Sequence, residues 1–167
     1  MIESQYLKDN VQNMQKLMAI RPLMRFETGS LKQLLKLSRI REYAHGEIII
    51  REGDADPWIY FLLSGQVKIE KQGIGIGIID DPGEIFGEMR ILDGLARSAS
   101  VCAEGKTVCL AVNTSMATNK LTSDERADIL LLFYKIFIEY IAVRLHLAND
   151  ELTESKKRLR NLTGEHA

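Results

Sequence analysis

The sequence has few of the residues that mark several large protein classes. Cysteine occurs only at Cys102 and Cys109, which form no CxxC pair, so a disulfide-stapled secreted domain is excluded and we expect a reducing compartment. The 22 lysines and arginines are balanced by 23 acidic residues, so the basic excess of a dedicated nucleic-acid binder is missing. The three histidines are scattered along the chain, which gives no support for a metal enzyme.

Long apolar runs are also missing. The first residues carry scattered charges, so we expect no signal peptide. The most apolar stretch, residues 129–143, contains Lys135 and Glu139 and is too short to span a bilayer. With 167 residues, 46% of them hydrophobic, and a net charge of -1, the chain can bury a core and is not expected to be disordered. We therefore expect a soluble cytoplasmic protein without a membrane segment.

The chain divides into three zones by pattern. Residues 1–39 have apolar positions at helical spacing, residues 40–113 alternate β-prone segments with glycine- and aspartate-containing turns, and residues 114–167 are helical again. Many short strands with regular turns favour a jelly roll. We predict one functional domain of the α+β class, mainly β: an eight-stranded jelly-roll β-barrel with N-terminal helices, a short inserted helix and a long C-terminal helix.

Two helices have the sequence of a capping box at their start, in Ser30 with Gln33 and in Thr122 with Glu125. The second half of the C-terminal helix keeps a narrow apolar seam with alternating spacings of three and four. Its members are Ile138, Ile141, Leu145, Ala148, Leu152, Ser155, Leu159 and Leu162. Such a seam is typical of a two-stranded coiled coil, although an amphipathic helix packed on its own domain remains an alternative. We favour a homodimer through this helix, because the narrow seam continues past any domain it could cover.

Residues 86–100, FGEMRILDGLARSAS, combine an anion site with an acceptor for hydroxyl groups. A short helix that begins after Gly87 presents free backbone N–H groups to a phosphate. Arg97 follows a glycine-containing turn and can offer its planar fork to anionic oxygens, and Ser98 adds a hydroxyl donor. Glu88 can accept hydrogen bonds from paired hydroxyls such as those of a ribose. An anion site beside a hydroxyl site indicates a nucleotide.

This segment resembles the phosphate-binding cassette of the cyclic nucleotide-binding domain, found in catabolite activator proteins, protein kinase A regulatory subunits and cyclic-nucleotide-gated channels. The family pattern is Phe-Gly-Glu, a short apolar helix, a variable turn and Pro-Arg-Ala/Ser-Ala-Ser/Thr, and it matches without a gap. Further matching positions are Gly46-Glu47, Ile49, Gly53-Asp54, Tyr60-Phe61-Leu62, Gly65, Val67, Ala142, Arg144 and Leu145. The resemblance extends from about Leu23 to Glu151.

The resemblance implies a set of contacts to a cyclic nucleotide. Arg97 would pair with the exocyclic phosphate oxygens, and Glu88 would bind the ribose 2′-hydroxyl. The other contacts to the phosphate and the base would come from Phe86, Gly87, Met89, Arg90, Ser98, Ala99 and Asn149. We predict a sensor rather than an enzyme, which binds cAMP in preference to cGMP and needs no cofactor or metal. It would signal to an unidentified protein partner through its C-terminal helix.

Three positions depart from the family pattern. Arg90 replaces a small residue, and it could crowd the pocket, strengthen the anion site or point outward. Ala96 replaces the usual proline, which loosens the turn that presents Arg97. Ala148 lacks the hydroxyl that some relatives direct at adenine, so Asn149 is left as the candidate for the base.

Two further expectations limit the function. A domain that has lost its ligand, with Glu88 and Arg97 as a structural ion pair, would serve only as a dimerisation or scaffold module, and this is the alternative. Few residues follow Leu162, so we expect no helix-turn-helix domain for DNA.

Overall fold

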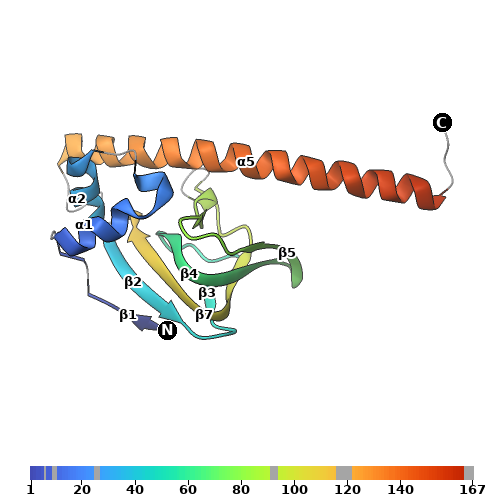
Figure 1. Cartoon of the computed structure of the whole chain (residues 1–167), viewed down its shortest axis with the longest axis horizontal. Helices are drawn as coiled ribbons and strands as arrows, with labels where there is room; N and C mark the ends of the chain where they lie inside the picture. The colour runs from blue at the N-terminus through green and yellow to red at the C-terminus, as the bar shows by residue number, and fades with distance from the viewer. Residues whose placement is uncertain (6, 9–10, 25–26, 91–93, 116–121, 164–167) are drawn as a thin grey trace. The chain divides into compact units, whose positions relative to one another are not determined.

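A computed structural model of the chain describes residues 1–5, 7–8, 11–24, 27–90, 94–115 and 122–163. The chain divides into two compact units, Met1–Leu132 and Phe133–Ala167. The first unit contains the strands, and the second continues the long helix α5 (Ser123–Thr163), which begins in the first (Figure 1).

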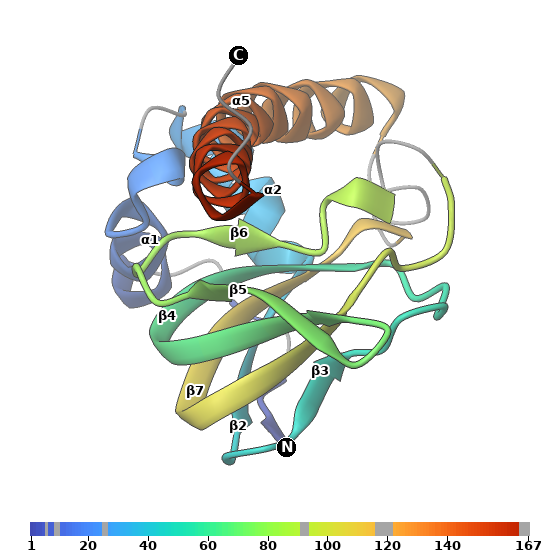
Figure 2. The ribbon, with the colours of Figure 1, turned by 90° about the vertical axis from the view of Figure 1, so that its right-hand side faces the viewer.

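The described residues of the first unit form an antiparallel sheet of seven strands. The strands are β1 (Ile2–Glu3), β2 (Ser38–Tyr43), β3 (Ile48–Ile50), β4 (Trp58–Lys71), β5 (Ile74–Ile79), β6 (Ile85–Phe86) and β7 (Ser100–Asn113). The main order is β1-β2-β7-β4-β5, while β3 pairs with β7 and β6 pairs with β4. Figure 2 shows the two long strands, β4 and β7, running side by side through the sheet.

The mainly β architecture is confirmed, but the described residues form seven strands where the sequence predicts eight. The sequence pattern separates residues 58–63 from 66–71 by a turn signal at Gly65, and residues 97–104 from 107–112 by another at Gly105. In the structure, Gly65 instead lies inside the single strand β4 and Gly105 inside the single strand β7. The two strands pair with register shifts on both sides of Ser64, and both glycines have positive φ. These glycines therefore mark irregularities within long strands rather than strand ends. The jelly-roll closure stays a prediction.

Gly65 shows why a glycine is needed inside a strand. Its φ is +91°, and a Cβ atom there would lie 2.4 Å from the Lys106 carbonyl oxygen and 2.8 Å from the Thr107 Cα. A side chain would collide with the backbone of the neighbouring strand, so Gly65 lets β4 and β7 stay paired through the irregularity.

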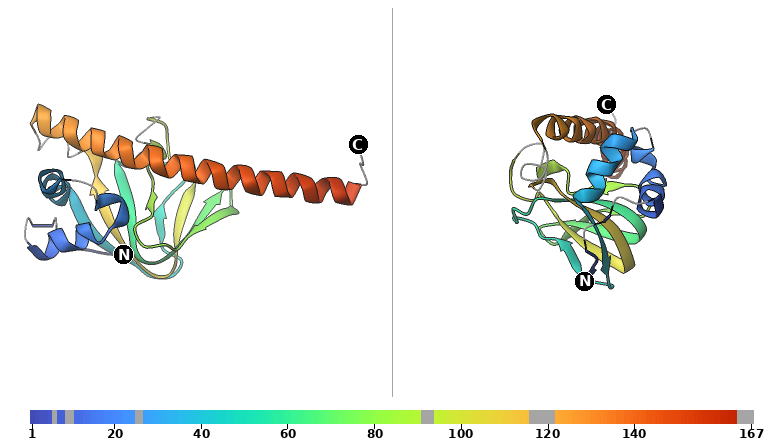
Figure 3. Two further views of the ribbon diagram at one scale, coloured as in Figure 1. Left: turned by 45° about the horizontal axis from the view of Figure 1, so that its top comes forward. Right: turned by 90° about the vertical axis from the view of Figure 1, so that its left-hand side faces the viewer.

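The expected N-terminal helices are confirmed as α1 (Val11–Met18), the 3-10 helix η1 (Arg21–Leu23) and α2 (Thr28–Lys36). Figure 3 shows α1 and α2 next to each other beside the sheet. The capping box expected at Ser30 is wrong, because α2 begins after Glu27 and has no side-chain cap. The short strand β1 has no counterpart in the sequence pattern, since two residues are too few for a periodic signal.

The capping box expected at the start of α5 is confirmed. The backbone N–H and the hydroxyl of Thr122 donate to Glu125 Oε2 at 2.9 and 3.1 Å, and the Glu125 N–H donates back to Thr122 Oγ1 at 3.3 Å. These reciprocal bonds satisfy backbone donors that the first helical turn leaves open. Within the described part of the chain, no helix combines the length and apolarity needed to cross a membrane.

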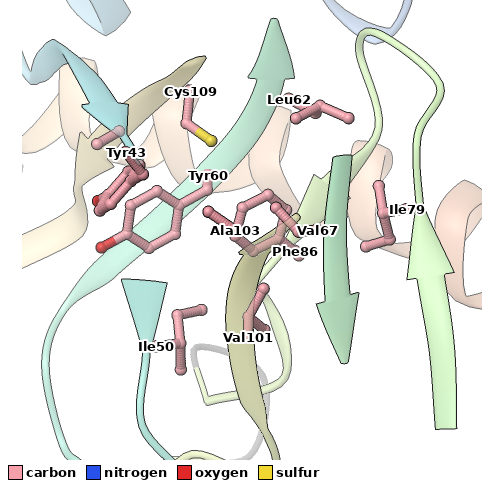
Figure 4. Close-up of a cluster of buried hydrophobic side chains, with 11 residues drawn as sticks. Tyr43, Ile50, Tyr60, Leu62, Val67, Ile79, Phe86, Val101, Ala103 and Cys109 are labelled. Atoms are coloured by element: carbon pink, nitrogen blue, oxygen red, sulfur yellow. The ribbon is translucent and has the colours of Figure 1, made fainter. Parts of the chain in front are cut away.

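An apolar core packs against the sheet, and Figure 4 shows Tyr60 among its buried side chains. The Tyr60 ring stacks on Phe86, with 5.2 Å between ring centroids and 9° between planes. The remaining buried members are Tyr43, Ile50, Leu62, Val67, Ile79, Val101, Ala103, Cys109 and Ala111. Burial raises the pKa of Cys109 to about 12, so this thiol is inert at neutral pH. Because Phe86 is the first cassette residue, the core fixes the point where the cassette begins.

Candidate functional site

The cassette turns away from the sheet at Gly87, directly after β6. Its φ is +82°, and a Cβ atom there would lie 2.8 Å from Arg97 Nη1 and 2.9 Å from Ile50 Cδ1. The Gly87 carbonyl also accepts a hydrogen bond of 2.5 Å from Arg97 Nη1. Glycine is therefore required at this position for two reasons, the left-handed backbone and the close approach of the guanidinium.

Arg97 points into the protein and is 4% exposed. Its Nε and Nη2 donate to the two carboxylate oxygens of Asp56 at 3.0 and 2.7 Å, which is the bidentate arrangement that arginine forms with carboxylates. Nη2 also donates to the carbonyl of Trp58, and Nη1 donates to that of Gly87. All three nitrogens of the guanidinium thus donate to acceptors of the protein itself.

Asp56 is the residue of this site that sequence reasoning missed. It lies in the loop between β3 and β4, and its side chain is 34% exposed. Burial alone would raise the pKa of this carboxyl, but the hydrogen bonds and charge of Arg97, together with the Trp58 N–H, outweigh burial and hold the pKa below its usual value. Asp56 therefore stays ionised at neutral pH and neutralises Arg97.

The same loop is joined to the end of the cassette by its backbone. The Gly53 N–H donates to the Arg97 carbonyl at 2.9 Å, and the Arg97 N–H donates to the Asp54 carbonyl at 2.8 Å. The Glu52 N–H donates to Ser100 Oγ at 2.9 Å. Loop residues 52–56 and the last cassette residues consequently form one hydrogen-bonded unit around the Arg97 side chain.

Arg90 folds back onto backbone carbonyls. Its Nε donates to the Asp56 carbonyl at 3.0 Å and its Nη2 to that of Ala55 at 2.7 Å. Its Nη1 donates to the carbonyls of Leu95 and Gly94 at 3.2 and 3.5 Å. Of the three roles that the sequence left open, the outward-pointing one does not fit these contacts, because the side chain connects the β3–β4 loop with the turn before Arg97.

The other cassette residues assigned to the ligand differ in exposure. The side chain of Glu88 is 2% exposed, whereas that of Met89 is 46% exposed. Ser98 is exposed, and its carbonyl accepts a hydrogen bond of 3.1 Å from Lys71 Nζ; Ala99 is half-buried. The structure therefore places a buried carboxyl and a buried guanidinium in one short segment, and their contacts with a ligand stay predictions.

Two parts of the expected site stay predictions. Met89 and Arg90 are helical, and the rest of the expected short helix, residues 91–93, lies outside the described residues. Asn149 is exposed on α5 and belongs to the second unit. Its contact with the base stays a prediction.

Comparison with known proteins decides the family. The family model of the cyclic nucleotide-binding domain matches residues 40–124, which is just over half of the chain and includes the whole cassette. The chain belongs to the cyclic nucleotide-binding domain family. The resemblance carried by residues 86–100 is thereby confirmed.

The individual relatives have low sequence identity to this chain. The chain is 31% identical over 100 residues to a cGMP-dependent protein kinase from Toxoplasma gondii, a match that covers 60% of this chain and 10% of the kinase. A cyclic nucleotide-binding domain from Methylobacillus flagellatus has a TM-score of 0.70 at 18% identity and covers 86% of this chain and 84% of that one. The catabolite activator protein of Thermus thermophilus has a TM-score of 0.58 at 27% identity, with coverages of 81% and 63%. The chain spans only 10 to 21% of the length of the first curated relatives.

Proposed function

We propose that this cyclic nucleotide-binding domain binds a cyclic mononucleotide in its cassette and acts as a regulatory module rather than an enzyme. The first candidate is cAMP, and cGMP is the second. The observation that carries the proposal is the buried guanidinium of Arg97, which lies in the same cassette as the buried carboxyl of Glu88. Family membership supports the same ligand class.

The chemistry follows from the acceptors around Arg97. A cyclic phosphate has one negative charge and two exocyclic oxygens, which suit the planar fork of a guanidinium. Because Asp56 already accepts two hydrogen bonds from Arg97, the phosphate must share the guanidinium with this carboxylate or replace it. The affinity for the ligand therefore depends on the difference in free energy between the Arg97–phosphate pair and the Arg97–Asp56 pair.

A regulatory output requires two arrangements with different affinity for the ligand. We infer that binding shifts the C-terminal helix α5 and that a downstream protein senses this shift. The first step of this change would occur in the β3–β4 loop, because a phosphate that pairs with Arg97 weakens the hydrogen bonds between Arg97 and Asp56.

Isothermal calorimetry with cAMP, cGMP and 5′-AMP tests the binding. We expect saturable heat with a cyclic nucleotide and an affinity at least about 100-fold lower for Arg97→Ala, because charge-assisted hydrogen bonds are lost. Arg97→Lys keeps the charge without the fork and serves as the second variant, and Arg21→Ala removes an exposed arginine outside the cassette. Absence of heat and of thermal stabilisation with both cyclic nucleotides would overturn the proposal.

A dimerisation or scaffold module without a ligand is the second candidate. The observation in its favour is that Asp56, Trp58 and Gly87 already accept the hydrogen bonds of Arg97, so burial of this charge does not depend on a bound anion. Such a module would have the same melting temperature with and without each cyclic nucleotide. The titration above therefore separates the two candidates.

We also infer that two chains associate through the apolar seam of α5. Ile138, Leu145, Leu152 and Leu159 recur every seven residues along this helix and are 66, 60, 53 and 62% exposed. A second copy that presents the same seam would cover them by knobs-into-holes packing.

A pair of matched variants tests this association by sedimentation. Leu145→Lys places a charge in the seam, whereas Leu147→Lys changes a residue of similar exposure, 58%, outside it. We expect the wild type and Leu147→Lys to sediment as dimers and Leu145→Lys as a monomer. A monomeric wild type at micromolar concentration would contradict the inference.

A further inference from the structure

We propose that Arg90 is a positioning residue that sets the affinity of the cassette for phosphate, because it holds Asp56 against Arg97. The inference rests on the proposed function, since it concerns how the same site binds its ligand. It assigns a role to the residue that departs most strongly in size and charge from the family pattern.

Two guanidinium groups hold Asp56 from different sides. Arg97 binds its carboxylate through Nε and Nη2, and Arg90 binds its backbone carbonyl at 3.0 Å and that of Ala55 at 2.7 Å. The backbone that carries the carboxylate is therefore fixed by one arginine while the other pairs with the carboxylate itself. Fixing this backbone lowers the entropy that Asp56 would gain if it left Arg97, and so strengthens Asp56 as a competitor of phosphate.

Arg90 also contacts the turn before Arg97, but less closely. Its Nη1 lies 3.2 Å from the Leu95 carbonyl oxygen and 3.5 Å from that of Gly94. The turn contains Ala96 where the family pattern has proline, so these bonds support a turn that lacks the usual rigid residue. Because the bonds to the β3–β4 loop are shorter, the hold on Asp56 is the stronger effect.

These contacts predict that the removal of Arg90 raises the affinity for phosphate, although an arginine is lost. Each guanidinium nitrogen of Arg90 donates to a carbonyl, so its removal need not cost a phosphate contact. Without Arg90, Asp56 competes less well for Arg97 and the phosphate binds more tightly. When Asp56 is neutralised, only the support of the turn remains, and the removal of Arg90 should then leave the affinity unchanged or lower it.

Calorimetric titration of cAMP into four proteins tests this dependence: wild type, Arg90→Ala, Asp56→Asn and the double variant. We expect Arg90→Ala to bind about 3- to 10-fold more tightly than wild type, and no such gain in the Asp56→Asn background. Arg51→Ala, at an exposed arginine near the start of the same loop, controls for the lost charge and should weaken binding slightly. Weaker binding of Arg90→Ala in the wild-type background would overturn the proposal, and so would an equal gain in both backgrounds, because the effect would then not depend on Asp56.

Hydrogen exchange without nucleotide supplies a second readout. The Gly53 N–H donates to the Arg97 carbonyl and the Trp58 N–H to Asp56 Oδ1, so both should exchange about 10-fold faster in Arg90→Ala, through local opening of the loop. The Ala103 N–H, which donates to the Glu47 carbonyl, is the internal control. Unchanged exchange at Gly53 and Trp58 would overturn the role of Arg90. Absence of cAMP heat in all four proteins would instead overturn the proposed function, while the exchange rates still decide whether Arg90 holds the loop.

Discussion

Two buried arginines of this domain each pair with a carboxylate, yet their surroundings differ. Arg41 is 9% exposed and Arg97 is 4% exposed. Arg41 donates to Glu3 at 2.8 Å, and Arg97 donates to Asp56 at 2.7 and 3.0 Å. Burial and an acidic partner are therefore shared, and neither distinguishes a ligand site from a structural one.

The distinction lies in what else surrounds each guanidinium. That of Arg41 lies 3.8 Å from the ring centroid of Trp58 and donates to the Tyr60 hydroxyl at 2.8 Å, so aromatic side chains of β4 fix it. Arg97 is instead surrounded by carbonyls and a loop carboxylate. A phosphate can take the place of hydrogen-bond acceptors on a loop, whereas it cannot replace an aromatic face. We therefore propose that a ligand can exchange with the acceptors of Arg97 but not with those of Arg41.

The variant Arg41→Ala tests whether Arg41 serves stability alone. We expect the free energy of unfolding to fall by about 3 kcal/mol, because the Tyr60 hydroxyl loses its charged donor and the Trp58 ring its stacked cation, while Glu3 keeps its pair with Arg39. Urea unfolding measures this loss. The folded fraction should bind cAMP within about threefold of wild type, because no phosphate contact is removed. A loss of affinity as large as that expected for Arg97→Ala would contradict the division of roles.

The variant Gly87→Ala tests the close packing of the cassette around Arg97. We expect about 2 kcal/mol lower stability and about 10-fold weaker cAMP binding, because a Cβ atom displaces Arg97 and Ile50 in addition to the backbone strain. Gly46→Ala is the matched control, since its φ is +78° but nothing lies within 4 Å of the added Cβ. It should cost only about 1 kcal/mol and leave binding unchanged. Equal losses in both variants would contradict the close packing at Gly87.

The pH dependence of stability gives the smallest expected effect. Since Arg97 lowers the pKa of Asp56 in the folded state, the pair stabilises the fold above the usual aspartate pKa of 3.8, and this contribution is lost as the pH falls through the lowered value. Thermal unfolding from neutral pH to about pH 3 should show a steeper loss for wild type than for Asp56→Asn. The difference should stay below about 1 kcal/mol, because the carboxylate is one-third exposed and solvent screens the pair. Identical profiles would mean that the ion pair is not formed in solution.

Features that depend on neighbouring residues could be predicted from the sequence. The cassette is contiguous, so Gly87, Glu88 and Arg97 carry their pattern together, and the capping box of Thr122 with Glu125 spans four residues. Most helices and strands therefore followed from local spacing and the cassette from its resemblance to the family pattern, although the equally local capping box expected at Ser30 is wrong.

Features that depend on distant residues could not be predicted. Asp56 is separated from Arg97 by 41 positions, and no local pattern links the two. Gly65 and Gly105 look like turn residues, because a glycine with positive φ is needed in a turn and in a strand irregularity alike. The bonds of Arg90 to Ala55 and Asp56 span 35 and 34 positions, which is why the sequence left its role open.

A crystal structure of the complex with cAMP tests the central claim most directly. We expect the exocyclic phosphate oxygens within about 3 Å of the Arg97 guanidinium, with Asp56 displaced from at least one of its two nitrogens and Glu88 facing the ribose. The contrary result would be cAMP bound elsewhere on the domain while Arg97 keeps both hydrogen bonds to Asp56.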